Sequence, residues 1–359
     1  MERGMNMDGI MEYLRQAVDQ GASDLFVVPG GSVTAKRGGK LCPMDGERLS
    51  PQRTQGYLTE VYALAGRDMG AFLTEGDDDF SFSVPGLARF RVNTYRQRGS
   101  LAAVIRIVAF SVPDAVALGI PEEIMALSKL ETGMVLFTGT AGCGKSTTQA
   151  CLIDRINRER ACHIITLEDP IEYLHRNQKS IVSQREIAVD TRDYHHALRS
   201  SLRQAPDVIQ LGEMRDLETV RTAMTAAETG HLIFATLHNK GAVNAIDRII
   251  DSFPADQQNQ IRIQLSAVVH TVVSQQLLPD KQGGMVPAFE ILRMTGAVRS
   301  MIREGRNHQI PAAIAAGGRE GMASMDDAIL KLYRAGRITK DTALHYCDNP
   351  EALRRKLEG

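Results

Sequence analysis

The chain has 359 residues, of which 43% are hydrophobic and 24% charged, and its formal net charge is -1. These values are typical of a globular protein with two domains, and they argue against general nucleic-acid binding, which usually brings a basic excess. Five cysteines without a C-x-x-C pair argue against a zinc site or a disulfide framework. No apolar run approaches the roughly 20 residues of a membrane span, and no signal peptide is visible. We therefore expect a cytoplasmic protein with no direct membrane insertion and no nucleic-acid partner.

Two helices and a short strand are predicted at the start of the chain. Apolar residues recur at three- and four-residue steps over residues 7–18, which predicts an amphipathic helix that ends near Gly21. A short apolar strand is expected at residues 25–28, before a Pro-Gly-Gly turn. A second helix is expected over residues 51–65, because Ser50 is a favourable N-cap and proline is favoured at the first helical position.

The first third of the chain is completed by strands, and it is predicted to be a small α+β domain on an antiparallel sheet. Apolar and polar residues alternate in three places, namely residues 80–84, 90–94 and 101–108. Residues 111–114 resemble a linker. We therefore expect an N-terminal domain over residues 1–110 and a second domain over residues 111–359.

From about residue 115, strands and helices alternate, which predicts an α/β domain with a parallel sheet covered by helices. The expected strands are residues 135–138, 163–167, 208–211 and 232–236. Polar or charged residues follow several of them. In open α/β sheets ligands lie at the carboxyl ends of the strands, so we expect these residues to converge on one ligand. The chain from residue 255 onward is predicted to be mostly helical.

A phosphate-binding loop is predicted at residues 139–146, which fit the pattern G-x-x-x-x-G-K-[ST] between a strand and a helix. Its glycines would let backbone N–H groups face the phosphates, and the helix N-terminus would add partial positive charge. We expect Lys145 to contact the β- and γ-phosphates and Ser146 to give a hydroxyl to Mg²⁺. The alternative is a glycine-rich turn that binds nothing. The expected nucleotide-binding residues are Gly139, Thr140, Ala141, Gly142, Cys143, Gly144, Lys145, Ser146 and Thr147.

Carboxylates follow two of the predicted strands. Glu213 could orient the attacking water, or it could only pair with a neighbour such as Arg215. Three carboxylates between Glu168 and Glu172 would raise the pKa of at least one of the group unless a cation neutralises them. Mg²⁺, bound directly or through water, is the natural cation, and an exposed acidic turn is the alternative.

Two histidines and two arginines are further candidates. His231 and His238 bracket a predicted strand, and a structural role is favoured for His231, whereas His238 follows the carboxyl end and could report the γ-phosphate. Arg91 and Arg106 lie on predicted strands of the first domain. They either belong to a solvated sheet face or reach a nucleotide held by another subunit, as arginine fingers do.

Four segments, taken together and in order, resemble the secretion-type ATPases and, within them, the type IV pilus retraction motors. They are similar to the Walker A motif at residues 138–148, the Asp box at 164–173, the Walker B motif at 202–216 and the His box at 228–238. Residues 297–305 are similar to a segment associated with retraction rather than assembly. The lack of an extra N-terminal domain and of a tetracysteine metal site also favours the retraction type.

The resemblance implies a PAS-like N-terminal domain followed by a RecA-like ATPase domain with a helical C-terminal part. It also implies ATP and Mg²⁺ as cofactors and a homohexameric ring with nucleotide between domains and subunits. By this resemblance Glu213 activates water, Glu168 helps to place Mg²⁺ or water, and His238 senses the γ-phosphate. Arg91 and Arg106 match the family's N-domain arginines that complete the site.

The function implied is an Mg²⁺-dependent ATPase motor that retracts pili through an inner-membrane platform protein, from a cytoplasmic position peripheral to that membrane. A pilus assembly or type II secretion motor, or a nucleotide-dependent regulatory module without turnover, are the alternatives. Cys143 departs from the family, because serine is usual there. Its backbone N–H still serves, and its thiol would make the site sensitive to alkylation or oxidation. Further departures affect regulation or ring contacts, and they lie at Phe26, Gln204, Ala205, Gln210, Asn239 and Lys240.

Overall fold

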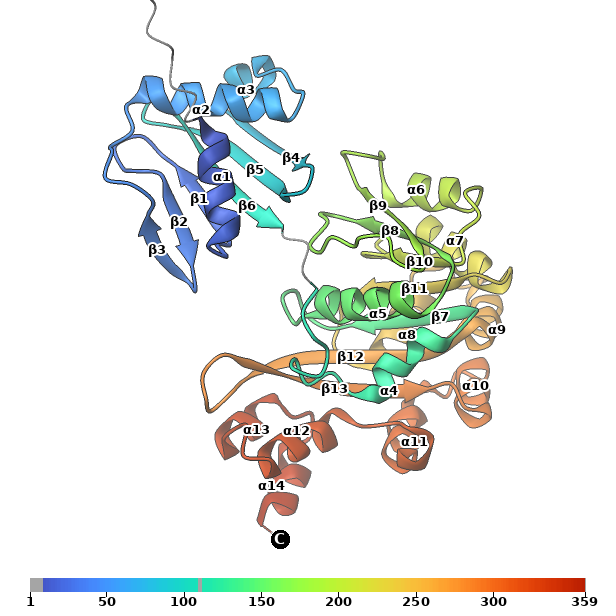
Figure 1. Cartoon of the computed structure of the whole chain (residues 1–359). Helices are drawn as coiled ribbons and strands as arrows, with labels where there is room; N and C mark the ends of the chain where they lie inside the picture. Colours follow the sequence, from blue (N-terminus) through green and yellow to red (C-terminus); the bar gives the residue numbers. More distant parts are fainter. Residues whose placement is uncertain (1–8, 109–111, 359) are drawn as a thin grey trace, which may run out of the picture. The chain divides into compact units, whose positions relative to one another are not determined.

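The chain forms two compact units, each with its own sheet (Figure 1). A computed structural model describes residues 9–108 and 112–358. One unit comprises residues 1–111 and 172–174, and the other comprises residues 112–171 and 175–359. The predicted boundary at residues 110 and 111, and the start of the predicted first helix, lie outside the described residues.

Over residues 9–108, the smaller unit combines three helices with a six-stranded antiparallel sheet in the order β3-β2-β1-β6-β5-β4. The predicted helices and strands of this unit are confirmed, and β2, β3 and α3 are additional. The N-cap at Ser50 is confirmed, because its side chain accepts a hydrogen bond from the Arg53 N–H. The elements are α1 (Ile10–Asp19), β1 (Asp24–Val27), β2 (Thr34–Arg37), β3 (Lys40–Pro43), α2 (Pro51–Leu64), α3 (Gly70–Glu75), β4 (Asp77–Val84), β5 (Ala88–Gln97) and β6 (Ser100–Val108).

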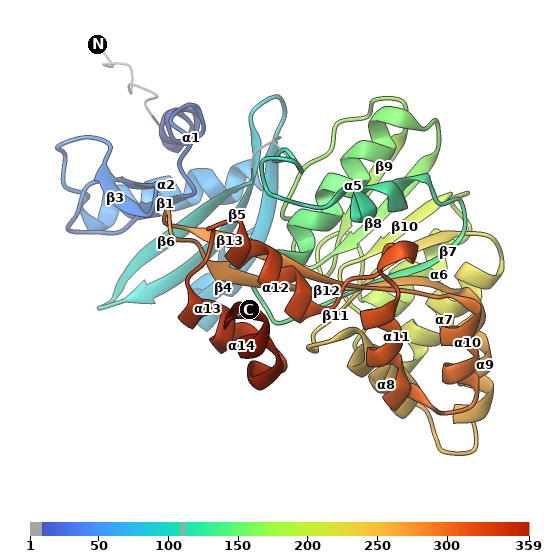
Figure 2. The ribbon, with the colours of Figure 1, turned by 90° about the horizontal axis from the view of Figure 1, so that it is seen from below.

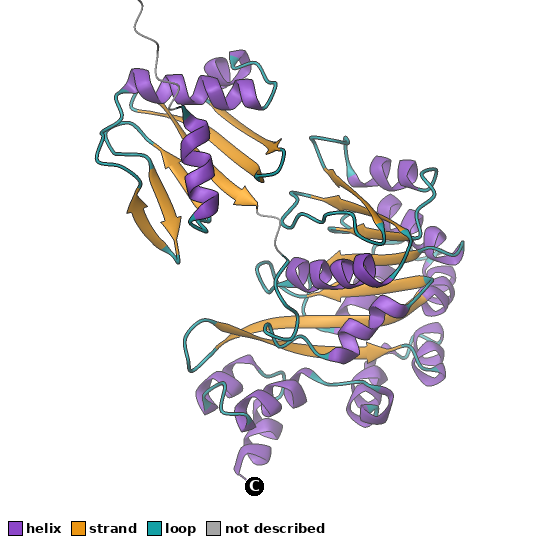
Figure 3. Ribbon diagram, viewed as in Figure 1, coloured by secondary structure: helices purple, strands orange, loops and turns teal. Residues whose placement is uncertain are grey.

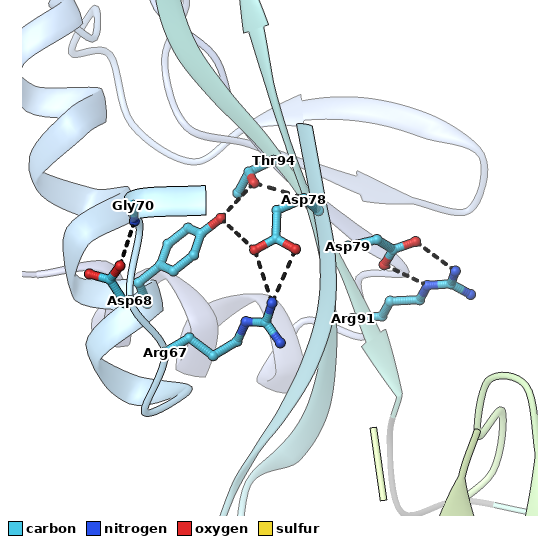
Figure 4. Close-up of polar contacts among 8 residues, drawn as sticks. Arg67, Asp68, Gly70, Asp78, Asp79, Arg91 and Thr94 are labelled. Carbon is cyan, nitrogen blue, oxygen red and sulfur yellow. Dashed lines mark hydrogen bonds and ion pairs between the residues drawn. The ribbon is translucent and has the colours of Figure 1, made fainter. Parts of the chain in front are cut away.

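One hydroxyl group in this unit joins α2 to the sheet. The Tyr62 side chain is 1% exposed. Its hydroxyl donates to the Asp78 carboxylate at 2.9 Å and lies 3.0 Å from the Thr94 hydroxyl. Arg67 contacts the same carboxylate at 3.2 and 3.3 Å, and Figure 4 shows Arg67, Asp78 and Thr94. Burial raises the pKa of Tyr62 to about 12, so the hydroxyl stays protonated as a donor.

The larger unit holds a seven-stranded sheet in the order β13-β12-β7-β11-β10-β8-β9. All neighbouring strands are parallel except β12 and β13, which form an antiparallel pair. The predicted mostly parallel sheet is therefore confirmed. The strands are β7 (Gly133–Thr138), β8 (His163–Glu168), β9 (Ile181–Glu186), β10 (Val208–Leu211), β11 (Leu232–Leu237), β12 (Val269–Pro279) and β13 (Met285–Arg293).

Helices cover both faces of this sheet (Figure 3). Apolar side chains of α4 and α5 pack on one face, and those of α6 to α11 pack on the other. The last three helices form a separate small core with the ends of β12 and β13, and Figure 2 shows the ribbons of α12, α13 and α14. The helices are α4 (Glu122–Met125), α5 (Lys145–Glu159), α6 (Tyr194–Ser201), α7 (Leu217–Glu228), α8 (Ala242–Asp251), α9 (Gln258–Val268), α10 (Gly296–Arg303), α11 (Ile310–Ala316), α12 (Met325–Arg334), α13 (Lys340–Tyr346) and α14 (Pro350–Glu358).

The prediction of a mostly helical segment from residue 255 is wrong for residues 269–293, which form β12 and β13. The reason is burial on both faces. β12 is buried along nearly its whole length, so its sequence lacks the apolar and polar alternation that marks a half-buried strand. Pro279 is the last residue of β12, and Gly283 and Gly284 lie in the turn between β12 and β13.

Replacement of Tyr62 by phenylalanine tests the link between α2 and the sheet. We expect the smaller unit to lose about 1 kcal/mol of stability, because Asp78 and Thr94 keep their burial but lose a hydrogen-bond partner. Hydrogen exchange of peptides from residues 51–108 in the full chain should accelerate about fivefold. Tyr95→Phe, at a half-exposed position on β5, is the control. Equal exchange rates in the two variants would contradict the expectation.

Candidate active site

The predicted phosphate loop connects β7 to α5, and two of its glycines are required by close packing against β12. Gly139 has φ +144°, and a Cβ atom there would lie 2.4 Å from the Gln275 carbonyl oxygen. Gly144 has φ +90°, and a Cβ atom there would lie 2.8 Å from Gln275 Nε2. A larger residue at either position would displace the loop from the strand.

Lys145 places an ammonium group inside this loop. The residue is 6% exposed, and its Nζ donates to the carbonyl oxygens of Gly139 at 2.8 Å and Thr140 at 2.9 Å. These acceptors are neutral. A phosphate would therefore be a stronger partner for the charge, since charge-assisted hydrogen bonds are about twice as strong as neutral ones.

Cys143 lies beside that ammonium group, with its Sγ 3.7 Å from Lys145 Nζ. It is 4% exposed. Burial raises the pKa of the Cys143 thiol, and the nearby Lys145 opposes the shift without cancelling it. The thiolate is the form that reacts with alkylating agents, so this environment disfavours the sensitivity expected from the sequence.

Gln275 braces the loop, and sequence reasoning missed it because residues 269–279 were assigned to a helix. Its amide oxygen accepts a hydrogen bond from the Thr148 hydroxyl at 2.9 Å. It follows Ser274, which is opposite Thr138 in the parallel ladder of β12 and β7. The first turn of α5 is thus tied to β12 beneath the loop.

Glu213 is held between two neighbouring strands just beyond the end of β10. The Gly212 N–H donates to the Leu167 carbonyl at 2.8 Å, and the Met214 N–H donates to the Thr236 carbonyl at 3.0 Å. Glu213 itself is 5% exposed. These backbone bonds fix the direction of its side chain at the carboxyl edge of the sheet.

The structure brings Glu213 and His238 together. Glu213 Oε2 lies 3.2 Å from His238 Nε2 and 2.6 Å from Arg215 Nε. The ion pair with Arg215, offered as the alternative role for Glu213, is therefore present beside the histidine contact. His231 has the structural role favoured for it, because its Nδ1 lies 3.0 Å from the Ala226 carbonyl oxygen.

Glu168 is the last residue of β8 and is 8% exposed. It accepts hydrogen bonds from the Thr166 hydroxyl at 2.6 Å and from Gln184 Nε2 at 3.1 Å. The exposed acidic turn that was the alternative is therefore wrong for this residue.

Tyr194, at the start of α6, is a neighbour of both carboxylates that sequence reasoning missed. A Cβ atom on Gly212 would lie 2.7 Å from its hydroxyl oxygen. Burial, and then the charges of Glu213, Asp169 and Glu168, raise the pKa of Tyr194. A neutral hydroxyl is therefore kept among the acidic groups. Nothing in the sequence pattern distinguishes this tyrosine from a core residue.

The side chains at this edge fit Mg²⁺. Ser146 offers a hydroxyl at the start of α5, and Glu168 offers a buried carboxylate, and oxygen atoms are the ligands that this cation prefers. Within residues 9–108 and 112–358, no group of three or more His, Cys, Asp or Glu residues forms a ready metal cluster.

Arg91 and Arg106 lie together in the smaller unit, whereas the other predicted site residues belong to the larger unit. They are directly opposite each other on β5 and β6. Arg91 forms hydrogen bonds of 3.1 and 2.7 Å with Asp79 (Figure 4), and Arg106 Nε lies 3.2 Å from Asp24 Oδ1. Like charges at opposed positions destabilise a sheet, so these carboxylates hold the pair in place.

In the described part of the chain no helix is both long and apolar enough to cross a membrane.

Comparison with known proteins places the chain among the secretion ATPases. It matches the family described as Type II/IV secretion system protein over residues 2–307. It is 41% identical over 343 residues to the type IV pilus retractation ATPase PilT of Pseudomonas aeruginosa, covering 95% of this chain and 99% of that protein. It is 38% identical over 348 residues to the type IV pilus ATPase PilU of the same organism, covering 97% and 91%.

The fold is also similar to a crystal structure of the pilus retraction motor PilT with bound ADP. The TM-score is 0.87 at 42% sequence identity, and the match covers 97% of this chain and 99% of that chain. The chain therefore belongs to the Type II/IV secretion system protein family and is an ATPase of type IV pilus or secretion systems.

Proposed function

We propose that this ATPase is an Mg²⁺-dependent motor that retracts type IV pili. The observation that carries its catalytic part is the contact between Glu213 and His238 at the sheet edge that also bears the Lys145 loop. The retraction role is supported by the identity to PilT over nearly the whole chain. We assign the smaller unit to the PAS-like class and the larger unit to the RecA-like class.

Each site residue is given one role. Lys145 and the loop amides bind the phosphates, Glu213 orients the attacking water, and His238 contacts Glu213 and reads the γ-phosphate. Ser146 and Glu168 would hold Mg²⁺. When bound, this cation neutralises charge that develops on the phosphates.

The working assembly is proposed to be a homohexamer at the cytoplasmic face of the inner membrane, bound to a pilus platform protein. Arg91 and Arg106 would complete the site of a neighbouring subunit. Their guanidinium groups already form ion pairs with Asp79 and Asp24. Both members of the Arg91–Asp79 pair are exposed, so this pair is weak enough to exchange for a phosphate. The Arg106 side chain is also exposed, although Asp24 is buried. The similarity to PilU supports an accessory pilus ATPase as the second candidate.

Replacement of Glu213 by glutamine should separate nucleotide binding from hydrolysis. We expect kcat to fall by about 10²–10³ because a general base contributes on this scale, while the affinity for ATP changes little. Lys145→Ala should lose both hydrolysis and tight binding. Phosphate release and fluorescent-nucleotide titration measure the two properties, with the exposed Glu218→Gln on α7 as the control. Normal turnover by Glu213→Gln would refute its assigned role.

Mixed assemblies test whether the arginines act on a neighbouring subunit. Alone, Arg91→Ala should lose at least about 10³-fold in kcat if the arginine acts as a finger. Lys145→Ala alone should be inactive. A mixture of the two variants should regain activity. A Lys145→Ala subunit still has Arg91 and can place it at the intact phosphate loop of a neighbouring Arg91→Ala subunit. Arg15→Ala, an exposed α1 residue, should remain active throughout. No recovery in mixtures that are shown to co-assemble would indicate action within one chain.

Deletion of the gene distinguishes the motor classes. A retraction motor should leave abundant but static surface pili, because assembly continues without removal. Loss of an assembly motor should leave no pili, and loss of an accessory ATPase should leave retraction weakened but present. Electron microscopy of pili, together with twitching assays, separates these outcomes, and re-expression of the wild-type chain is the control. Absence of pili after deletion would overturn the retraction assignment.

A further inference from the structure

One side-chain amide on β9 contacts both a site carboxylate and the segment of chain that follows it. Gln184 Nε2 donates to Glu168 Oε1 at 3.1 Å, and Gln184 Oε1 accepts a hydrogen bond from the His175 backbone N–H at 2.8 Å. An ionised carboxylate only accepts and a backbone N–H only donates, so the two partners fix which end of the amide is nitrogen. The amide therefore joins Glu168 to the segment that connects β8 to β9.

The same oxygen of Glu168 has a second donor. The Thr166 hydroxyl donates to Glu168 Oε1 at 2.6 Å, and Thr166 lies directly opposite Gln184 in the parallel ladder of β8 and β9. Glu168 is nearly buried, and such hydrogen bonds offset part of the cost of burying a carboxylate. Two donors on one oxygen also restrict rotation of the carboxylate, because a turn of the group would break both bonds. The direction of Oε2 follows, since both oxygens belong to one planar group.

Other side chains also hold the segment between β8 and β9. Glu186 of β9 accepts a hydrogen bond from the Ile171 N–H at 3.2 Å. Within the segment, the Asn177 side chain accepts one from the Val182 N–H at 2.9 Å. The conformation of the segment therefore has supports besides Gln184, so we expect it to stay folded when the Gln184 amide is removed.

We propose that Gln184 is a positioning residue that sets the direction of the Glu168 carboxylate toward Mg²⁺. This inference rests on the proposed role of Glu168, and it assigns Gln184 an action through that carboxylate rather than on the nucleotide. Hydrogen-bond partners of a ligating carboxylate orient it, and their loss weakens metal binding by about 10–100-fold. The bond to the His175 N–H anchors the amide itself, so Glu168 and the segment after β8 keep one fixed geometry.

The test uses Gln184→Met in the full chain, since methionine keeps an unbranched side chain of similar length and removes both hydrogen bonds. Binding of a fluorescent, non-hydrolysable ATP analogue is measured in EDTA and over a series of MgCl₂ concentrations. Affinity in EDTA should equal that of the wild type, because the phosphate loop is unchanged. The Mg²⁺ concentration that half-saturates the tightening of binding should rise about tenfold, at the low end of the range for loss of such a partner.

A double-mutant cycle shows whether the effect passes through Glu168. Glu168→Gln should weaken Mg²⁺ binding by itself, and adding Gln184→Met should cause little further loss, because residues of one hydrogen-bond network are not additive. Asn177→Ala removes a different bond of the β8–β9 segment and should keep wild-type Mg²⁺ affinity. If Gln184→Met does not bind the analogue in EDTA, Gln184→Asn replaces it in the cycle. The same loss is expected there, since the shorter amide cannot span both partners.

The outcomes separate this inference from the proposed function. Unchanged Mg²⁺ affinity in Gln184→Met, beside weakened affinity in Glu168→Gln, would overturn the positioning role alone. An equal loss in Asn177→Ala, or fully additive losses in the double variant, would overturn it as well. Unchanged Mg²⁺ affinity in Glu168→Gln would refute the proposed role of Glu168 itself, and the inference with it.

Discussion

Parallel pairing of β7, β11, β10 and β8 is the constraint on which the nucleotide site depends. Strands that run in one direction end at one edge, so residues far apart in the sequence are delivered to the same place. Here the edge carries the Lys145 loop, His238, Glu213 and Glu168 in the order of the strands. The backbone bonds of Gly212 and Met214 extend the pairing past the end of β10, which keeps the Glu213 carboxylate in register with its neighbours.

The edge of the sheet holds buried charged side chains, and burial of a charge disfavours folding. Lys145, Glu168 and Glu213 are all nearly buried, and each buried ion loses several kcal/mol of hydration. Neutral carbonyl groups solvate the ammonium, and Arg215 pairs with Glu213. In the proposed function, a triphosphate would supply the opposite charge for Lys145, and a divalent cation would supply it for Glu168.

Sequence reasoning identified most of the fold and the principal residues of the site, for physical reasons that differ between regions. The phosphate loop and the half-buried strands were predictable because backbone geometry and alternation leave a local pattern. β12 was not, because a strand buried on both faces reads like a buried helix. Gln275 and Tyr194 were missed for a related reason, since each acts through a contact between segments that no spacing reveals.

The division of charges between the two units bears on how such a motor can be controlled. Arg91 and Arg106 belong to the smaller unit, and the lysine and carboxylates belong to the larger one. In the proposed function, groups from separate bodies complete the site, so hydrolysis would be timed by domain and subunit movement.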